Sequence, residues 1–428
     1  MADTLDFEAV EAAVRRQALR LAARVVAQRL NTDTSDHPGP TWACACGQPA
    51  HYAGRRAKRF TSVLGDLTLE RAYYHCAACD TGFCPRDRAL GLEGTSLSPA
   101  VTRLVGGVGA LVSFAEGSEL LRELADVAVG PKHVERAAEA LGREIATDER
   151  RVVEPGPPAA VAPTLYLGMD GTGIPMRAAE LDGRVGKQPD GSAQTREVKL
   201  CTVWSAEARD ADDTPVRDPG SVTYSAAIER AASRDTDPGP SEFAARVVRE
   251  ATRRGFAQAP RRVVLGDGAP WIWNLADEHC PDALQIVDRF HAKEHLSTVA
   301  KAVYGVTSEL GRQWAHQRHV ELDAGDLAAV VRALETHAPA HDDARKCADY
   351  IARNRHRMRY PEFRAQGLCT STGVVEAGCK VAIGTRLKRA GMHWTVAGAN
   401  AIIALRSAKL SGRFEDFWER RSQTRAAG

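Results

Sequence analysis

The chain contains the stretch Leu165-Tyr166-Leu167-Gly168-Met169-Asp170, an apolar run that finishes on a carboxylate. A second run of the same kind is Val263-Val264-Leu265-Gly266-Asp267. Short apolar runs followed by turn-forming residues are typical of buried strands. In open α/β sheets, the ligand-binding residues stand at the carboxyl ends of the strands. The two runs therefore predict strands that end on Asp170 and Asp267, which can meet only if these strands are neighbours.

A third carboxylate, Glu376, lies in the helical-looking stretch Ser371–Lys380, much further along the chain. Two carboxylates at strand ends and a third from a helix can hold two Mg²⁺ (or Mn²⁺) ions, which activate a nucleophile and stabilise the leaving oxygen in phosphoryl transfer. Other interpretations remain open for each residue alone. An aspartate after a strand is often a turn or helix cap, and Glu376 could pair with Lys380 on the next helical turn. Taken together, the three residues favour a metal-dependent nuclease.

The segment around the two aspartates alternates between strand and helix patterns, which predicts an α/β layer architecture. The predicted strands and helices are strands 164–170, 196–205, 221–225, 261–266 and Leu284–Val287, and helices 241–255 and from Ala292 onward. Residues 307–368 then show helical patterns only.

Five of the ten cysteines crowd between Cys44 and Cys84. Four of them form two close pairs, which suits a tetrahedral structural Zn²⁺ held by Cys44, Cys46, Cys76 and Cys79. The β-rich module around them is too small to be stable by burial alone, so the metal would contribute directly to its folding. Cys84, His51 or His75 could change the ligand set, and the alternative to a zinc site is a group of reduced, unliganded core cysteines.

The N-terminal part of the chain has helical patterns on both sides of this module. Residues 7–30 predict one long helix, and residues 117–142 predict two helices joined by a short turn, with Pro131 in the first turn of the second helix. Such a helix–turn–helix can place its second helix in the major groove of DNA, although two such helices are also a common packing unit. The candidate DNA contacts on this helix are Lys132, His133 and Arg136. The clearest linker is Pro155-Gly156-Pro157-Pro158.

The length of 428 residues predicts two to four domains, and 44% hydrophobic with 26% charged residues predicts a globular chain. No apolar run of membrane-spanning length and no signal-peptide pattern occurs, and the cysteine usage suits a reducing compartment, so we expect a cytoplasmic protein. The net charge is only +2, but Arg345–Gly428 carries 17 Lys/Arg against 6 Asp/Glu. A basic surface beside an acidic metal site suits a phosphate-rich substrate, while a solvated helical surface is an equal alternative.

Three blocks of this sequence resemble the catalytic blocks of the ISKra family of bacterial insertion-sequence transposases: Tyr166–Arg177, Gly266–Trp273 and Ser371–Trp394. The resemblance implies a DDE transposase of the Mutator-like branch, with a ribonuclease-H-like core and an all-α insertion. It assigns Asp170, Asp267 and Glu376 as ligands of Mg²⁺. The string Asp288-Arg289-Phe290-His291 is similar to a further motif of that branch, which makes Asp288 and His291 auxiliary residues. A helix-capping Asp288 is the alternative, as is a zinc site that includes His295.

The resemblance also implies that the protein binds terminal inverted repeats and target DNA, cleaves the DNA and transfers the strand, as a homodimer or larger assembly on DNA at the bacterial nucleoid. Near the third block, Lys380, Arg386, Lys388 and Arg389 could hold phosphates. Trp394 or His393 could stack on an unpaired base, or Trp394 could be a core anchor. The rival functions are a DNA-binding regulator without catalysis and a structure-specific nuclease.

These expectations combine into a multidomain α+β protein. The predicted parts are an N-terminal helix (1–40), a zinc-ribbon-like module (41–96), a helix–turn–helix region (97–150), a ribonuclease-H-like α/β catalytic core (160–306 and 369–428) and an all-α insertion (307–368).

Overall fold

The computed structural model of this chain describes residues 6–151, 161–181, 195–211, 213–229 and 241–426. The chain divides into two compact units: unit 1 is Met1–Ile145 with Arg413–Gly428, and unit 2 is Ala146–Gly412. The linker predicted at 155–158 lies outside the described residues. The C-terminal helix groups with unit 1, whereas the predicted catalytic core extends to residue 428.

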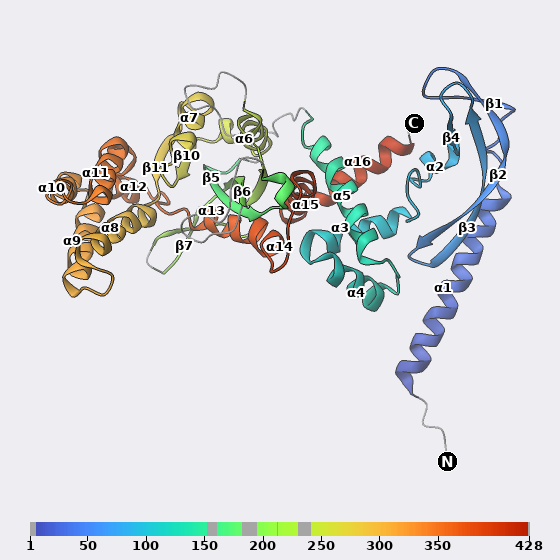
Figure 1. Cartoon of the computed structure of the whole chain (residues 1–428), viewed down its shortest axis with the longest axis horizontal. Helices are drawn as coiled ribbons and strands as arrows, with labels where there is room; N and C mark the ends of the chain where they lie inside the picture. Colours follow the sequence, from blue (N-terminus) through green and yellow to red (C-terminus); the bar gives the residue numbers. More distant parts are fainter. Residues whose placement is uncertain (1–5, 152–160, 182–194, 212, 230–240, 427–428) are drawn as a thin grey trace, which may run out of the picture. The chain divides into compact units, whose positions relative to one another are not determined.

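The first half of unit 1 is a helix packed on an antiparallel sheet (Figure 1). Helix α1 (Phe7–Thr32) is two residues longer than its predicted end and lies against strand β3. The apolar side chains of this contact are Ala23, Phe60, Leu67, Leu69 and Leu92. The sheet has the order β1 (Thr41–Ala43), β2 (Pro49–Ser62), β3 (Gly65–Cys76) and β4 (Thr81–Phe83), followed by the short helix α2 (Pro85–Ala89).

The second half of unit 1 is helical and contains the predicted helix–turn–helix. Its helices are α3 (Pro99–Leu111), α4 (Phe114–Ala125), α5 (Pro131–Asp148) and α16 (Phe414–Ala426). Helix α4 begins with a capping box at Ser113 and ends at Asp126 in a left-handed conformation, so the chain turns sharply before Pro131. A Cβ on Gly106 would lie 2.6 Å from Leu141, so this glycine lets α3 and α5 approach closely.

Unit 2 is built on a mixed five-stranded sheet with the order β11-β10-β5-β6-β9. Strands β10 and β11 run parallel to β5, while β6 and β9 continue the sheet in antiparallel fashion. The strand bounds are β5 (Thr164–Pro175), β6 (Thr195–Trp204), β9 (Thr223–Ala227), β10 (Arg261–Gly266) and β11 (Leu284–Val287). All five predicted strands are present, which confirms a multidomain α+β chain with a mixed sheet.

One strand end differs from the prediction. Strand β5 does not finish at Asp170 but continues to Pro175, because beyond Gly168 it remains paired with β6 alone. Asp170 therefore lies where β5 loses its partner β10, not where β5 itself ends.

Helices lie on both sides of this sheet, with α6 and α7 on one side in Figure 1 and α13 and α14 on the other. The bounds are α6 (Glu242–Arg253), α7 (Pro270–His279), α13 (Gly373–Gly378), the π-helical η5 (Cys379–Gly384), α14 (Thr385–Leu387) and α15 (Val396–Leu410). The core between these layers includes Tyr166 stacked on Trp204, with ring centroids 5.3 Å apart. The short elements η2 (Ala178–Glu180), β7 (Ala208–Arg209), β8 (Pro215–Val216) and η3 (Phe256–Gln258) complete the layer.

A group of helices interrupts unit 2 between β11 and α13. It consists of α8 (Arg289–Tyr304), α9 (Glu309–Ala324), α10 (Leu327–Glu335), α11 (Asp342–Asn354), η4 (Arg355–Arg357) and α12 (Tyr360–Ala365). These helices cover the predicted all-helical stretch 307–368 up to Ala365, and α8 precedes it. None of the described helices combines the length and the apolar character needed to cross a bilayer.

Candidate functional site

Asp170 and Asp267 lie at the same level of two neighbouring strands. In the parallel ladder of β5 and β10, the last pair joins Gly168 to Leu265, and each aspartate follows two residues later on its own strand. The carboxylate of Asp170 accepts a hydrogen bond from the Gly171 amide at 2.6 Å, and that of Asp267 accepts one from the Ala269 amide at 2.9 Å. The sheet therefore brings together two aspartates that are remote in the sequence.

Helix α13 brings Glu376 toward these strands. Val375, the preceding residue, packs on β5 so closely that a Cβ on Gly168 would lie 2.2 Å from its Cγ2 atom. Gly168 thus permits the close approach of α13. Glu376 is exposed, and its Oε1 atom lies 3.3 Å from the hydroxyl oxygen of Thr372. Among the residues that the structure describes, the alternative ion pair of Glu376 with Lys380 does not form.

The electrostatics link the three carboxylates, which we call the carboxylate triad. Burial raises the pKa of Asp170 above its ordinary value, and the negative charges of Asp267 and Glu376 raise it further. Hydrogen bonds with the Cys379 thiol and the Gly171 amide offset part of this rise. A bound divalent cation would remove the repulsion, because an opposite charge nearby favours the ionised carboxyl group. The triad is therefore suited to a hard cation.

The ligand atoms of the carboxylate triad lie further apart than those of the thiol cluster in unit 1. Among the described residues, the one group of three or more potential ligands whose ligand atoms all lie within 4.8 Å of one another is Cys44, Cys46, Cys76 and Cys79. Asp288, His291 and His295 do not form such a group either, so the alternative zinc site at these residues has no support.

Asp288 is a fully buried positioning residue for the segment that carries Glu376. One carboxylate oxygen accepts the His291 amide at 2.7 Å and caps helix α8. The other oxygen accepts both the amide and the hydroxyl of Thr372, with the hydroxyl at 2.6 Å. The capping alternative is therefore confirmed, but the same carboxylate also fixes Thr372, whose hydroxyl oxygen lies 3.3 Å from Oε1 of Glu376. The His291 side chain plays no part in this cap, and its ring packs against His295.

Replacing Asp288 with Asn is expected to lower the free energy of unfolding by about 2–3 kcal/mol, because the amide group of Asn would face the Thr372 N–H donor and leave it unsatisfied. Thermal and urea unfolding of the full chain measures the change. The matched control is Asp326→Asn, which alters an exposed cap of α10. Asn caps helices as well as Asp does, so this control should change stability little. An equally small effect of Asp288→Asn would show that Asp288 acts as a helix cap alone.

Tyr350 of helix α11 forms a wall beside Asp267. Its hydroxyl donates to the Asp267 carbonyl at 2.8 Å, and its ring fills the space above Gly268. The half-buried His295 lies beside this ring, with centroids 4.5 Å apart and the ring planes tilted by 43°. Burial and the neighbouring His291 lower the pKa of His295, while the charge of Asp267 opposes this. Sequence reasoning missed Tyr350, because it lies within an amphipathic helix without any motif.

The basic residues predicted near the triad have different environments. Lys380 and Lys388 are exposed, and Lys388 donates a hydrogen bond to the hydroxyl of Thr172, two residues beyond Asp170. Arg389 is partly buried. Arg386 is fully buried, with its guanidinium 5.3 Å from the ring centre of Trp394, so it does not suit the predicted DNA contact.

Trp394 is a buried core residue, so of its two predicted roles the core anchor holds and base stacking does not. Its indole nitrogen donates to the Leu387 carbonyl at 3.0 Å, and its backbone pairs with Pro175 and Arg177 at the end of β5. Such a buried ring is not available to stack on a base. The neighbouring His393 is exposed.

The thiol cluster of unit 1 matches the predicted zinc ligand set. Cys44 and Cys79 have their Sγ atoms 3.6 Å apart, as do Cys46 and Cys76. Hydrogen bonds with Thr81 and the other thiols lower the pKa of Cys79 to about 6. Cys84 is half-buried and outside the group. Four sulfur ligands from two adjacent turns fit a structural Zn²⁺, so neither Cys84 nor a histidine is needed.

The candidate DNA contacts on α5 are only partly available. Arg136 is exposed, and Lys132 is exposed but bonded to Glu135 at 2.7 Å. His133 is half-buried, and burial lowers its pKa, so its ring stays neutral at physiological pH. Of the three, Arg136 is the most accessible to DNA.

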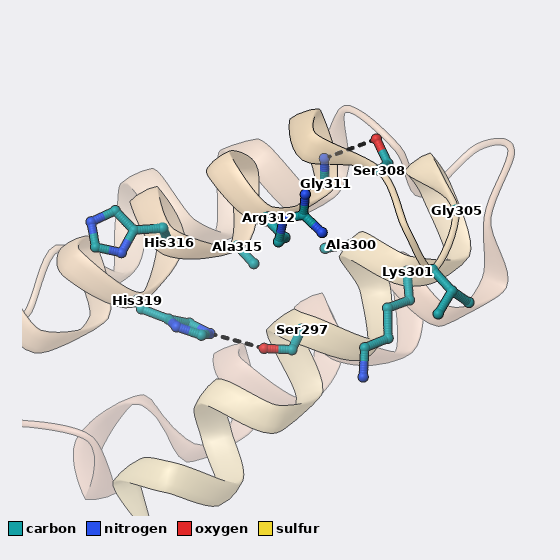
Figure 2. A pocket seen from close by; sticks show the side chains of 11 residues that line it. Ser297, Ala300, Lys301, Gly305, Ser308, Gly311, Arg312, Ala315, His316 and His319 are labelled. Carbon is teal, nitrogen blue, oxygen red and sulfur yellow. Dashed lines mark hydrogen bonds between the residues drawn. The ribbon is translucent and has the colours of Figure 1, made fainter.

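A separate pocket of about 300 Å³ lies between α8 and α9 (Figure 2). Its lining includes Lys301, Arg312 and His316, and no residue of the triad. Figure 2 shows His319 bonded to Ser297 across the two helices, at 3.2 Å, and this ring also donates to the Lys293 carbonyl at 2.9 Å. These bonds hold α8 against α9, so the pocket belongs to the structure of the helical group.

No protein-family model matches this chain, and no curated protein matches it. Among solved structures, the chain is similar to the Drosophila P element transposase in a strand transfer complex, at 10% sequence identity and a TM-score of 0.27. The similarity covers 80% of this chain and 86% of the other. A likeness at this level does not define an activity.

Proposed function

We propose that this chain is a DDE-type transposase of the kind that its three sequence blocks resemble, the ISKra family, with a ribonuclease-H-like core in unit 2. The observation that supports the proposal is that Asp170 and Asp267 lie at one level of adjacent parallel strands, with Glu376 of α13 near enough for its charge to raise the pKa of Asp170. The mixed sheet and the interrupting helical group support it.

The carboxylate triad offers the hard oxygen ligands that Mg²⁺ or Mn²⁺ prefers. In the proposed enzyme, Asp170, Asp267 and Glu376 would hold the ions. Bound there, the ions would supply activation of the attacking oxygen and stabilisation of the leaving oxygen. The chain's own part is positioning: β5 and β10 fix the two aspartates, and Asp288 fixes the Thr372 segment before Glu376. Lys388, beside β5, can neutralise a substrate phosphate.

The proposed substrate is DNA that carries the terminal inverted repeats of an insertion sequence. Water attacks the phosphodiester at the end of the element, and the bond to the 3′ oxygen breaks to leave a 3′ hydroxyl. That hydroxyl then attacks a phosphodiester of target DNA, so one bond to phosphorus forms as another breaks. The helix–turn–helix, with Arg136, and the thiol module would recognise the ends. Such a protein acts at the bacterial nucleoid, on two ends at once.

The test uses the full chain and duplexes taken from the DNA that flanks its gene on both sides. We expect cleavage at the element ends in Mg²⁺, and binding without cleavage in EDTA. Cleavage of any duplex without preference for these ends would instead identify a structure-specific nuclease. Binding without cleavage in Mg²⁺ would identify a regulator, and either result would overturn the proposal.

A further inference from the structure

Helix α1 has two apolar faces, and only one of them is covered in unit 1. Ala23, Val26, Ala27 and Leu30 pack on β3 and its neighbours. Large apolar side chains on the other face are exposed, by 79% at Phe7, 42% at Val10, 61% at Val14, 64% at Leu21 and 56% at Val25. Single exposed apolar residues are common on protein surfaces, but a continuous row of them marks an interaction site.

These residues form a narrow row that we call the apolar stripe: Phe7, Val10, Val14, Ala18, Leu21 and Val25. Successive members are three or four residues apart, so they fall within roughly 80° of the helix circumference, opposite the face that packs on β3. The steps of three, four, four, three and four residues are those of a coiled-coil seam with one additional four-residue step, which unwinds the supercoil locally. Figure 1 shows the N-terminal half of α1 extending beyond the end of β3.

The charges of α1 are divided between its two ends. The first turns carry Glu8 and Glu11 and no basic residue, whereas every charged residue from Arg15 to Arg29 is an arginine. A helix with this division attracts a second copy of itself in antiparallel orientation, because each acidic end then lies beside a basic end. In parallel orientation, like charges would face one another. The stripe also suits this arrangement, since its members lie nearly symmetrically about residue 16.

We propose that the apolar stripe of α1 is a self-association surface, which pairs with α1 of a second copy of this chain as an antiparallel two-helix coiled coil. This inference goes beyond the proposed function, because the pairing needs neither DNA nor a metal at the triad. The stripe spans fewer than three heptads, so the association is reversible, with a dissociation constant on the order of 10 µM.

Sedimentation of the full chain over a range of concentrations tests the surface, without DNA. We expect the wild type to approach twice the mass of one chain at high concentration. Val14→Glu combined with Leu21→Glu should remain monomeric. The matched control, Ala9→Glu with Ala13→Glu, adds the same charge at exposed positions outside the stripe, at the acidic end of the helix, and should associate at least as tightly as the wild type. Circular dichroism confirms that both variants are folded. A monomeric wild type, or association of the stripe variant, would overturn the proposal and leave the stripe to a different partner.

A second pair of substitutions tests the orientation. Glu8→Lys with Glu11→Lys makes the whole helix basic, which should weaken antiparallel association about fivefold or more. In a parallel pair, the acidic ends of the two helices face each other, so the change only replaces repulsion between glutamates by repulsion between lysines. The dissociation constant would then stay the same. An unchanged dissociation constant would therefore overturn the antiparallel arrangement.

Discussion

Replacing Asp170 with Asn, Asp267 with Asn or Glu376 with Gln is expected to reduce Mg²⁺-dependent DNA cleavage by about a thousandfold or more. Each change keeps the size of the side chain but removes the negative charge that a divalent cation needs. DNA binding should persist, because the helix–turn–helix belongs to unit 1 and the triad to unit 2. Single-turnover cleavage and a gel-shift assay on the same duplexes measure the two properties separately.

The matched control is Asp349→Asn, which removes an exposed carboxylate on α11 next to Tyr350. It should leave cleavage unchanged, since it neither belongs to the triad nor supports it. A triad variant that still cleaved at the wild-type rate would remove that residue from the proposed site.

Asp170→Asn also has an expected effect on stability. Because the folded protein raises the pKa of Asp170, the ionised carboxylate destabilises the fold at neutral pH when no cation is bound. The Asn variant should therefore melt at a higher temperature than the wild type in EDTA. It should lose the stabilisation that Mg²⁺ gives to the wild type.

Protons compete with the cation for the Asp170 carboxylate. A higher Mg²⁺ concentration should therefore shift the acidic limb of the pH profile of cleavage to lower pH.

The strands of unit 2 could be predicted from the sequence because each is a short apolar run with a turn after it. In the sheet, Gly168 of β5 pairs with Leu265 of β10. This register places the two aspartates, each two residues further on, at the same level. Alternation between strand and helix patterns was enough to find this layer. The cysteine spacing was enough to find the thiol cluster.

Other features depend on contacts between remote segments, which a pattern does not encode. The bond from Thr372 to Asp288 joins residues that are 84 positions apart, and Tyr350 reaches Asp267 from 83 positions away. Arg386 stands in a basic run that predicts exposure, yet it is buried beside Trp394. In the same way, α16 follows unit 2 in the sequence but packs with unit 1.

Removing one ligand of the thiol cluster is expected to unfold the sheet of unit 1. Cys44→Ser or Cys76→Ser should lower the zinc content well below one ion per chain, because the structural site loses one of its four thiolate ligands. The apolar cluster beside the thiols is small: Ala50, Ala72 and Tyr74, with Cys44 and Cys76 themselves. Zinc binding supplies about 10–16 kcal/mol in modules of this kind, so its loss exceeds what this cluster can offset. Metal analysis and amide hydrogen exchange over β1–β4 measure both effects.

Cys84→Ser is the matched control, since Cys84 lies in the same segment but outside the cluster. It should keep one zinc ion and normal exchange protection. Because α1 packs on β3 through its own apolar contacts, the ligand variants should lose protection first at the turns that hold the thiols and later along β2 and β3. Full protection in Cys44→Ser without zinc would mean that apolar packing alone holds the module, with the four thiols as reduced core residues.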